Sequence, residues 1–422
     1  MRQSIRAATQ PIAAQLSLPG SKSITNRALL LAALAKGKST LSGMLFSDDT
    51  RVFAAALRQL GVAIEFDEST RMAEITGCQG KFPKVQSKVW CGDAGTAARF
   101  LVPACAAAGG TYHFDGSVQL RKRPLAPLLA SLTQQGAVVS AGQLPLTMDS
   151  AGNLSGGVLT VDGRQSSQFT SGLLLAAPFF KNALTLNTSD VVSAPYVVMT
   201  GAMMREFGAD VTWVDEECIR VGVESQYAGR HYTVEPDWST ASYFFAAAAV
   251  TGGSIRIDNM QRQSLQGDSQ FLTVLEQMGC VVTENPHSLQ VQGPAVLKGV
   301  SVNMRDFSDT FMTLAALACF ADSPTTITHI GHTRLQESDR IMAMGKNLQK
   351  LGVQVEEGGD WLRIFPGVPR AGVVDSFGDH RIAMACALIG LRVSGIEIND
   401  ASCVAKTCPD FFERWQTLSH AT

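Results

Sequence analysis

The chain has 422 residues, of which 45% are hydrophobic and 17% charged, with 38 glycines and 16 prolines. This length and composition are typical of a globular protein of two or three domains, and they exclude a disordered chain or a small disulfide-stapled scaffold. Lysine and arginine number 35 against 37 aspartates and glutamates, for a formal net charge of −2. Broad attraction to nucleic acid or to an anionic membrane is therefore not expected, and an anionic ligand requires a local cluster of cations.

The nine cysteines form no CxxC pair and show no Cys/His spacing typical of a zinc site, so we expect reduced thiols, no metal and no cofactor. The longest apolar runs, such as 244–250 and 311–321, are far shorter than the ~20 residues that span a bilayer. No apolar segment of a secretory signal follows Arg2 and Arg6. We therefore expect a cytoplasmic protein, monomeric, with no membrane segment and no nucleic-acid partner.

An internal repeat runs along the whole chain. Six segments of helical length, rich in alanine and leucine, are each followed by a turn and a short β-type run. The turns lie 73, 72, 71, 70 and 71 residues apart, at Gly37, Gly110, Asn182, Gly253, Ser323 and Ser394. This spacing predicts six copies of one supersecondary unit of about 70 residues. Because the first helix of each copy is apolar on nearly all sides, we expect it to lie inside a layer.

A second landmark has the same period. In five copies an amphipathic pattern ends in glycine, at Gly61, Gly136, Gly208, Gly279 and Gly352. Such glycines suit the first position after a helix, where the backbone adopts a positive φ that costs glycine nothing. Each copy is therefore predicted to run strand, buried helix, strand, surface helix, strand.

The ends of the chain predict how the copies are grouped. The sixth copy has no closing strand, and residues 1–18 precede the first copy without a helix, so we expect the N-terminus to supply the missing strand. One lobe then contains 1–18 and 235–422 with copies four to six, and the other contains 19–234 with copies one to three. Two short crossings, near 18–21 and 234–237, would act as a hinge. Helix N-termini directed at the cleft between the lobes would favour phosphate or carboxylate ligands.

Polar residues precede or begin each internal helix. They include Ser21, Lys22, Ser23, Arg27, Asp93, Gly95, Arg99, Ser166, Ser167, Gln168, Asp237, Ser239, Asp309, Asp379, His380 and Arg381. Serine, threonine and aspartate at such positions are equally well explained as helix N-caps. Cations are not, because the helix dipole disfavours them there, and we expect a bound anion such as phosphate to compensate them. The GxxxxGK[ST] phosphate loop is absent, so nucleotide binding is only weakly indicated.

Further basic residues precede surface helices. Arg123 stands before Pro124, which suits the first position of a helix, and Arg340 and Lys406 occupy the same place in copies five and six. Arg121 and Lys122 are better explained as an ordinary solvated surface.

Several motifs, in order along essentially the whole chain, resemble those of the 5-enolpyruvylshikimate-3-phosphate synthase family: LPGSKSITNRALLLAALA, GDAGTAARFL, RKRPLAPLL, SSQFTSGLL, SAPY, GDHRIAMA and AKTCPDFF. The resemblance implies an α/β fold, a two-lobed inverse α/β barrel built from six βαβαββ repeats, three per lobe. It also implies a transferase of the shikimate pathway of aromatic amino acid biosynthesis. The enolpyruvyl group of phosphoenolpyruvate would move to the 5-hydroxyl of shikimate 3-phosphate, with release of phosphate.

The same motifs imply which residues hold each substrate. Shikimate 3-phosphate is expected at Lys22, Ser23, Arg27, Ser166, Ser167, Gln168, Ser193, Tyr196, Asp309, His332 and Gln336. Phosphoenolpyruvate is expected at Lys22, Gly95, Arg123, Gln168, Arg340, His380, Arg381 and Lys406. Because Gly95 has no side chain, the family's phosphoenolpyruvate-mimicking inhibitor glyphosate is expected to fit as well.

The implied reaction needs a proton for the methylene carbon of phosphoenolpyruvate and an acceptor for the proton of the attacking hydroxyl. The resemblance assigns Asp309 as acceptor, Glu337 as its acid/base partner and Lys22 as a donor to the leaving phosphate. The intermediate would be a tetrahedral ketal, so the resemblance implies no covalent enzyme nucleophile and no metal. Closure of the lobes would protect the intermediate from water.

Three residues depart from the family pattern. Gln336 stands where the family usually has lysine, His332 where it often has asparagine, and Asp93 where it usually has asparagine. One positive charge is lost and one negative charge is added, so affinity for shikimate 3-phosphate, or its pH dependence, is expected to differ from the family norm.

Three alternatives remain open. A related enolpyruvyl transferase acts on UDP-N-acetylglucosamine, but it carries a cysteine in the loop that reads GSVQLRKRP here. The RNA 3′-phosphate cyclase group has related repeats but uses a nucleotide. A non-catalytic anion-binding protein is the third, and the joint presence of Asp309, Glu337 and Lys22 argues against it.

Overall fold

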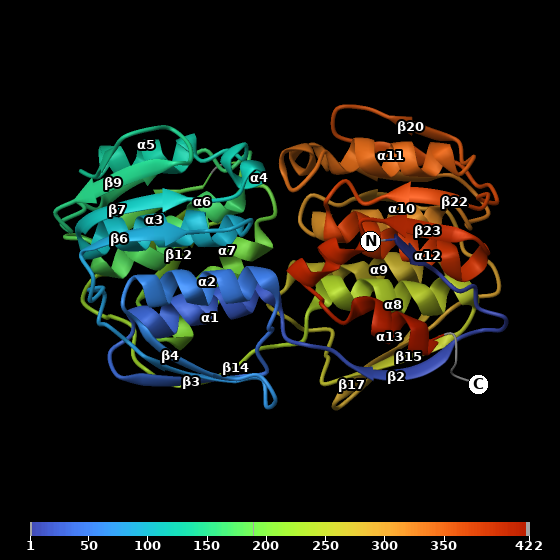
Figure 1. Ribbon diagram of the computed structural model, residues 1–422, viewed down its shortest axis with the longest axis horizontal. Helices are drawn as coiled ribbons and strands as arrows, with labels where there is room; N and C mark the ends of the chain where they lie inside the picture. Colours follow the sequence, from blue (N-terminus) through green and yellow to red (C-terminus); the bar gives the residue numbers. More distant parts are fainter. Residues whose placement is uncertain (1, 189, 419–422) are drawn as a thin grey trace. The chain divides into compact units, whose positions relative to one another are not determined.

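The structure, a computed structural model, describes residues 2–188 and 190–418 and separates into two units (Figure 1). The terminal unit consists of Met1–Pro19 and Glu235–Thr422, and the middle unit of Gly20–Val234. Pro19, which the sequence analysis placed in the other lobe, belongs to the terminal unit.

Three mixed four-stranded sheets with a common order form the framework of the middle unit. The first contains β14 (His231–Thr233), β3 (Lys38–Ser42), β5 (Met72–Thr76) and β4 (Ala63–Asp67). The second contains β6 (Gln86–Trp90), β7 (Gly110–Asp115), β9 (Leu146–Ser150) and β8 (Val138–Val139), and the third β10 (Gly157–Thr160), β11 (Leu184–Asn187), β13 (Cys218–Val221) and β12 (Val211–Asp215). In each sheet the first two strands are parallel and the others antiparallel, as the predicted repeat requires.

The terminal unit repeats this arrangement with strands from both ends of the chain. Its sheets are β2 (Ala13–Ser17), β15 (Ser254–Asp258), β17 (Ser288–Gln292) and β16 (Val281–Asn285); β18 (Ser301–Asn303), β19 (Thr325–Thr328), β21 (Leu362–Ile364) and β20 (Val355–Glu357); and β22 (Gly372–Asp375), β23 (Ile396–Asn399) and β1 (Arg2–Ser4). Strand β1 pairs antiparallel with β23. Strand β1 from the N-terminus thus completes the sheet of the sixth copy, beside β23 and β22. A second N-terminal strand, β2, pairs in parallel with β15 and opens the fourth sheet.

Six buried helices form the interior, three in each unit. They are α1 (Lys22–Leu34), α3 (Gly95–Ala108) and α6 (Ser167–Ala176) in the middle unit, and α8 (Trp238–Thr251), α10 (Phe311–Ala318) and α12 (His380–Arg392) in the terminal unit. Nearly every side chain of these helices is buried, as their all-round apolar sequence predicts. Within each unit they pack against one another, α3 against α1 and α6, and α8, α10 and α12 mutually.

Half-exposed helices alternate with the buried ones: α2 (Asp48–Gln59), α5 (Ala126–Gln134), α7 (Pro195–Glu206), α9 (Phe271–Gln277) and α11 (Arg340–Lys350). In each case the predicted glycine lies two positions after the last residue of the helix, with φ of 93°, 107°, 101°, 101° and 86° in chain order. All five predicted C-terminal glycines therefore have a positive φ, which costs glycine nothing because it lacks a Cβ. Two further short helices are α4 (Val118–Arg121) in the middle unit and α13 (Phe411–Leu418) in the terminal unit.

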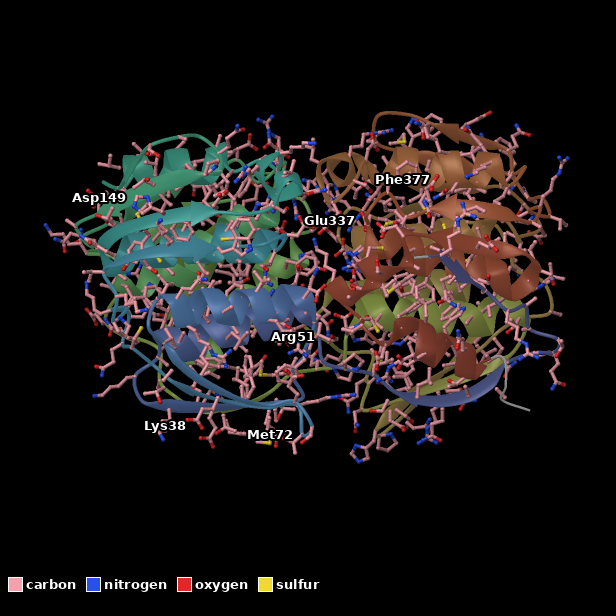
Figure 2. The ribbon with its side chains drawn as sticks, in the orientation of Figure 1. Lys38, Arg51, Met72, Asp149, Glu337 and Phe377 are labelled. Atoms are coloured by element: carbon pink, nitrogen blue, oxygen red, sulfur yellow. The ribbon has the colours of Figure 1, made fainter. Side chains whose placement is uncertain are left out.

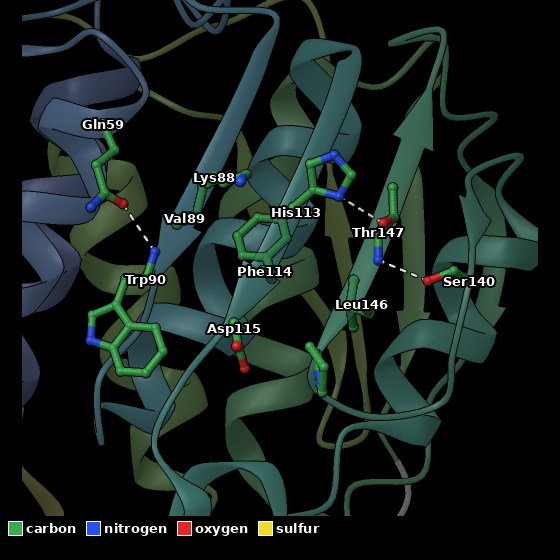
Figure 3. Close-up of a pocket in the computed structure, with 11 residues that line it drawn as sticks. Gln59, Lys88, Val89, Trp90, His113, Phe114, Asp115, Ser140, Leu146 and Thr147 are labelled. Atoms are coloured by element: carbon green, nitrogen blue, oxygen red, sulfur yellow. Dashed lines mark hydrogen bonds between the residues drawn. The ribbon is translucent and has the colours of Figure 1, made fainter.

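A hollow of about 600 Å³ lies on the second sheet of the middle unit, over β6, β7 and β9 (Figure 3). Its polar groups already bond to one another: the Trp90 N–H donates to Gln59 Oε1 over 2.9 Å, and the Thr147 N–H donates to Ser140 Oγ over 2.8 Å. None of its lining residues is a predicted site residue. No helix within the described ranges is long and apolar enough to cross a membrane.

Candidate functional site

Arg27 is the more deeply buried of two buried arginines in the described part of the middle unit, the other being Arg99. Arg27 is 1% exposed and lies on α1, where its guanidinium donates to Thr200 Oγ1 over 2.8 Å, to Ser171 Oγ over 3.3 Å and to the Tyr196 carbonyl over 3.3 Å. All of these partners are uncharged. Burial lowers the pKa of Arg27 to about 10, so it is still charged at neutral pH. A buried cation held by neutral groups is suited to an anionic ligand.

Tyr196 and Ser23 contact this cation, and the other predicted serines of the middle unit lie on or beside α6 and α7. The Arg27 guanidinium lies 5.8 Å from the centroid of the Tyr196 ring, at the start of α7. Ser166 caps α6 and accepts a bond from the Gln168 N–H over 3.2 Å, while Ser167 is buried beside it. Ser193 has a φ of 53°, which is strained for a residue with a Cβ and is typical of functional positions. Ser23 joins the group through its carbonyl, which accepts from Arg27 over 3.1 Å.

Gly95 lies against two arginines at the start of α3. A Cβ at this position would come 2.6 Å from Arg99 Nη1 and 2.9 Å from Arg123 Nη1, so any side chain would displace a guanidinium. Arg99 also donates to Gln168 Oε1 over 3.0 Å, which links this group to α6. Helix α3 has no side-chain cap, because Ala94 is its N-cap residue. The backbone N–H groups at its start and two guanidiniums thus form an anion-binding arrangement.

Lys22, the first residue of α1, has a partner that the sequence analysis missed. Its Nζ lies 3.4 Å from Asp49 Oδ2, and both side chains are largely buried. The compensating anion expected for this cation is therefore supplied by the chain itself.

The helix dipole disfavours fewer of the predicted cations than expected. Arg27 and Arg99 are the sixth and fifth residues of their helices, whereas the dipole acts within the first turn. Helix α5 begins at Ala126, so Pro124 precedes the helix and does not occupy its first position as predicted. Arg123 therefore stands in the loop between α4 and α5, where its N–H donates to the Leu120 carbonyl of α4 over 3.1 Å.

Arg340 organises the predicted residues of the terminal unit. Its guanidinium is 1% exposed and bonds to Asp379 Oδ2 over 2.8 Å, to Glu337 Oε2 over 2.8 Å and to Asp309 Oδ1 over 2.9 Å, with Glu337 labelled in Figure 2. It also donates to the Gln336 side-chain carbonyl. Burial acts to lower the pKa of Arg340, but the three carboxylates outweigh it and raise that pKa above its ordinary value.

Two further cations share the same carboxylates. Arg381 Nη2 donates to Asp309 Oδ2 over 2.6 Å, and Lys406 Nζ lies 3.5 Å from Glu337 Oε1. Asp309 belongs to the 3₁₀ helix η3 (Ser308–Thr310), and Lys406 ends the 3₁₀ helix η5 (Ala401–Lys406). We name this group of Arg340, Arg381, Lys406, Asp309, Glu337 and Asp379 the ionic cluster. Its three cations are paired with three carboxylates of the chain itself, which the sequence did not reveal as their partners.

His332, Gln336 and His380 border the ionic cluster. His332 Nε2 is 2.8 Å from Ser308 Oγ, one residue from Asp309. Burial lowers the pKa of His332 to about 4, and Arg305 and Arg340 lower it too, while Asp309 opposes them. His332 is therefore neutral at pH 7, like the asparagine that the family often has. His380 is fully buried, with Nδ1 3.7 Å from Asp379 Oδ1.

The lowered pKa of His332 predicts a pH-dependent stability difference. Between pH 4 and 6.5 the unfolded chain binds a proton at this histidine that the folded chain does not, so folding stability falls as the pH drops through that window. H332N removes the effect, so its free energy of unfolding relative to the native chain is expected to be about 2 kcal/mol higher at pH 5 than at pH 8. Thermal unfolding at both pH values measures it. H287N, at an exposed position, is the control, and an equal difference in both variants would contradict the prediction.

Three carboxylates lay outside the predicted set. Asp49 pairs with Lys22, and Asp379 combines a cap of α12, accepting from the Arg381 N–H over 3.0 Å, with its bond to Arg340. Asp268 is buried near Asp309. Only Asp379 carried a sequence signal, its place just before a helix. Within the described ranges, no group of three or more His, Cys, Asp or Glu side chains is placed to hold a metal ion.

The sequence comparison decides the family. The model of the family described as EPSP synthase (3-phosphoshikimate 1-carboxyvinyltransferase) matches residues 7–415. The chain belongs to the EPSP synthase family. The family resemblance of the motifs is thereby confirmed, and the EPSP synthase fold accounts for the two units and their repeated sheets.

Individual EPSP synthases resemble this chain along its full length. A 3-phosphoshikimate 1-carboxyvinyltransferase of Trichormus variabilis is 42% identical and covers 97% of each chain, and one of Syntrophobacter fumaroxidans is 41% identical and covers 98% of this chain and 100% of its own. The structure of EPSP synthase from Acinetobacter baumannii matches with a TM-score of 0.84 at 26% identity, over 99% of this chain and 98% of that one. An enolpyruvyl transferase of Streptomyces tendae shares the fold, with a TM-score of 0.79 at 18% identity over 98% and 96% of the two chains. The predicted two-lobed α/β class is confirmed.

Proposed function

We propose that this EPSP synthase transfers the enolpyruvyl group of phosphoenolpyruvate to the 5-hydroxyl of shikimate 3-phosphate and releases phosphate. The family match over residues 7–415 carries this conclusion, because it includes every residue to which a substrate or a proton transfer was assigned. The ionic cluster supports it with three cations for an anionic substrate and two carboxylates, Asp309 and Glu337, for proton transfer.

The middle unit is proposed to bind shikimate 3-phosphate. Among the residues that the structure describes, Arg27 is a buried cation bonded only to uncharged groups, including the carbonyls of Ser23 and Tyr196. The motifs add Ser166, Ser167 and Gln168, at the start of α6, and Ser193. The substrate's carboxylate and phosphate are the complementary charges. Since Arg27 is already held by Thr200 and Ser171, binding would require little reordering of its side chain.

Phosphoenolpyruvate is proposed to bind Arg340, Arg381 and Lys406, with Lys22, Gly95, Arg123, Gln168 and His380 as the further residues implied by the motifs. Its carboxylate and phosphate would compete with Asp309 and Glu337 for the same N–H groups. A carboxylate that loses a cationic partner becomes a stronger proton acceptor. Substrate binding would thus convert Asp309 from a structural counter-ion into a base.

Proton transfers are proposed to follow from this exchange. Asp309 accepts the proton of the attacking 5-hydroxyl, Glu337 serves as acid and base at the methylene carbon, and Lys22 donates to the leaving phosphate. The carboxylates that balance the cations before binding thereby carry out proton transfer after it. The products are 5-enolpyruvylshikimate 3-phosphate and phosphate, formed through a tetrahedral ketal.

R27M is expected to raise the KM for shikimate 3-phosphate by roughly 100-fold, because a charge-assisted bond to the substrate is lost. Its effect on stability is expected to be small, since the substitution leaves no carboxylate unpaired and Thr200 still bonds to Ser171 over 3.0 Å. Steady-state kinetics and thermal unfolding of the same sample measure both. A KM unchanged within threefold would contradict the assignment of Arg27.

Phosphate release from phosphoenolpyruvate tests the proposed function. It should require shikimate 3-phosphate and should not occur with UDP-N-acetylglucosamine, the acceptor of the alternative enzyme. The names of the relatives do not favour that alternative. Release with UDP-N-acetylglucosamine alone would overturn the proposal, and binding of both substrates without release would indicate a non-catalytic protein.

A further inference from the structure

Asp268 is a buried carboxyl group that the proposed proton transfers do not use. It lies on the 3₁₀ helix η2 (Gly267–Gln270) and is 3% exposed. Ser239 Oγ, near the start of α8, donates to its Oδ2. Its Oδ1 is buried and has no hydrogen-bond partner among the residues that the structure describes. A buried carboxyl group that is bonded on one side only is unfavourable when ionised, so folding alone does not account for it.

Gln266, two residues before Asp268, fixes the position of this segment. Gln266 Oε1 accepts from the Trp238 N–H over 3.0 Å, and Gln266 Nε2 donates to the Pro236 carbonyl over 2.8 Å and to Glu235 over 3.2 Å. These bonds attach η2 to the beginning of α8. Asp268 is therefore held in one place relative to its neighbours.

The charged neighbours of Asp268 belong to the ionic cluster. Helix η2 packs against α8 and against η3, which carries Asp309. The groups that act on Asp268 are Asp309 from η3, Arg381 from α12 and Asp237 from the N-cap of α8. On α9, Glu276 is paired with Arg262 at the surface. Asp309 and Asp268 thus share the field of one cation, Arg381.

We propose that Asp268 is a positioning residue for Asp309, one that stays protonated so that Asp309 remains the ionised partner of Arg381. Two carboxyl groups near one cation do not both ionise freely, and the more buried one keeps its proton. Burial and, to a lesser extent, the charge of Asp309 raise the pKa of Asp268 to about 7, while Arg381 and the bond from Ser239 oppose the shift. Asp268 does not need to touch a substrate to act in this way.

The consequence is an alkaline limb in the pH profile. When Asp268 ionises, it adds a negative charge beside Arg381 and Asp309, and this charge weakens the binding of anionic phosphoenolpyruvate. The kcat/KM for phosphoenolpyruvate should therefore fall about tenfold per pH unit above the ionisation, as for loss of one proton. This inference depends on the proposed function.

D268N is the decisive variant, because asparagine has the shape of the protonated carboxyl group and cannot ionise. Its kcat/KM for phosphoenolpyruvate at pH 6 should lie within about threefold of the native value, and its alkaline limb should begin at least one pH unit higher. An unchanged limb, or an equal loss of activity at every pH, would overturn the proposal. D322N is the control: Asp322 is exposed and accepts a comparable bond from Ser323 Oγ over 2.7 Å.

Two further measurements test the proposal if D268N folds poorly or if the native chain proves inactive. S239A removes the bond that favours the ionised form of Asp268, so its limb should also move to higher pH, and a shift to lower pH would count against the proposal. Thermal unfolding needs no activity. Because the folded chain keeps a proton at Asp268 that the unfolded chain releases, native stability falls as the pH rises from about 4 to 7. The Tm of D268N relative to the native chain should therefore be several degrees higher at pH 8 than at pH 5.

These readouts separate the two proposals. A native chain that releases no phosphate contradicts the proposed function. If the native chain is active but its alkaline limb matches that of D268N, and the Tm difference between the two chains does not change with pH, only the assignment of Asp268 is contradicted.

Discussion

D309N is expected to lower kcat by roughly 10²–10⁴-fold, the range for loss of a positioned acid or base. The KM for phosphoenolpyruvate should at the same time stay unchanged or fall. Asp309 accepts bonds from Arg340 over 2.9 Å and from Arg381 over 2.6 Å, so it competes with the anionic substrate for both guanidiniums. Neutral asparagine competes less. The combination of low kcat and undiminished affinity distinguishes a base from a residue that only binds substrate.

Steady-state kinetics at saturating shikimate 3-phosphate, with calorimetric binding of phosphoenolpyruvate, measure both quantities. D322N supplies the same chemical change at an exposed position and should behave like the native enzyme. A D309N variant with kcat within fivefold of native, or with binding weakened tenfold, would show that Asp309 is not the proton acceptor.

R340M is expected to destabilise the protein and to abolish activity. The substitution leaves Asp379, Glu337 and Asp309 without their shared cation, and Asp379 is fully buried. Removing one partner of a buried ion pair costs about 3–5 kcal/mol. For a unit of this size we expect Tm to fall by about 10 °C at pH 8. The loss should be smaller at pH 5, because protonation of the carboxylates removes the uncompensated charge.

R262M is the matched control for this loss. Arg262 pairs with Glu276 at the surface of the same unit, where an ion pair contributes about 0–1 kcal/mol. Its Tm should therefore change by no more than about 3 °C. If R340M and R262M lowered Tm equally, the ionic cluster would not stabilise the terminal unit as described.

Local signals explain why much of the fold was predictable. Gly61 and its four counterparts were recognisable because the chain turns with a positive φ just after each helix. Glycine adopts this conformation without the cost that other residues incur. The buried helices were recognisable because their own sequence is apolar on nearly all sides of the helix. The pairing of β14 with β3 was not predictable, because it joins the two ends of the middle unit and leaves no trace in local sequence.

The motifs proposed individual site residues but could not show how their charges pair in the structure. Motifs selected Asp309, Glu337 and Arg340, yet no spacing rule shows that Arg340 bonds to Asp379, 39 residues away. The partner of Lys22, Asp49, lies in the first turn of α2, where an acidic residue is expected for the helix dipole alone. Asp268 stands in a polar run that resembles any surface turn. Tertiary packing buries it beside the ionic cluster, and only the structure shows this.

The most direct test of the account is a crystal structure of the enzyme with phosphoenolpyruvate and shikimate 3-phosphate bound. We expect phosphoenolpyruvate oxygens at hydrogen-bond positions on Arg340, Arg381 and Lys406, and we expect Asp309 to have left at least one of its two arginines. Intact bonds from Asp309 to both arginines, with phosphoenolpyruvate bound away from these cations, would contradict it.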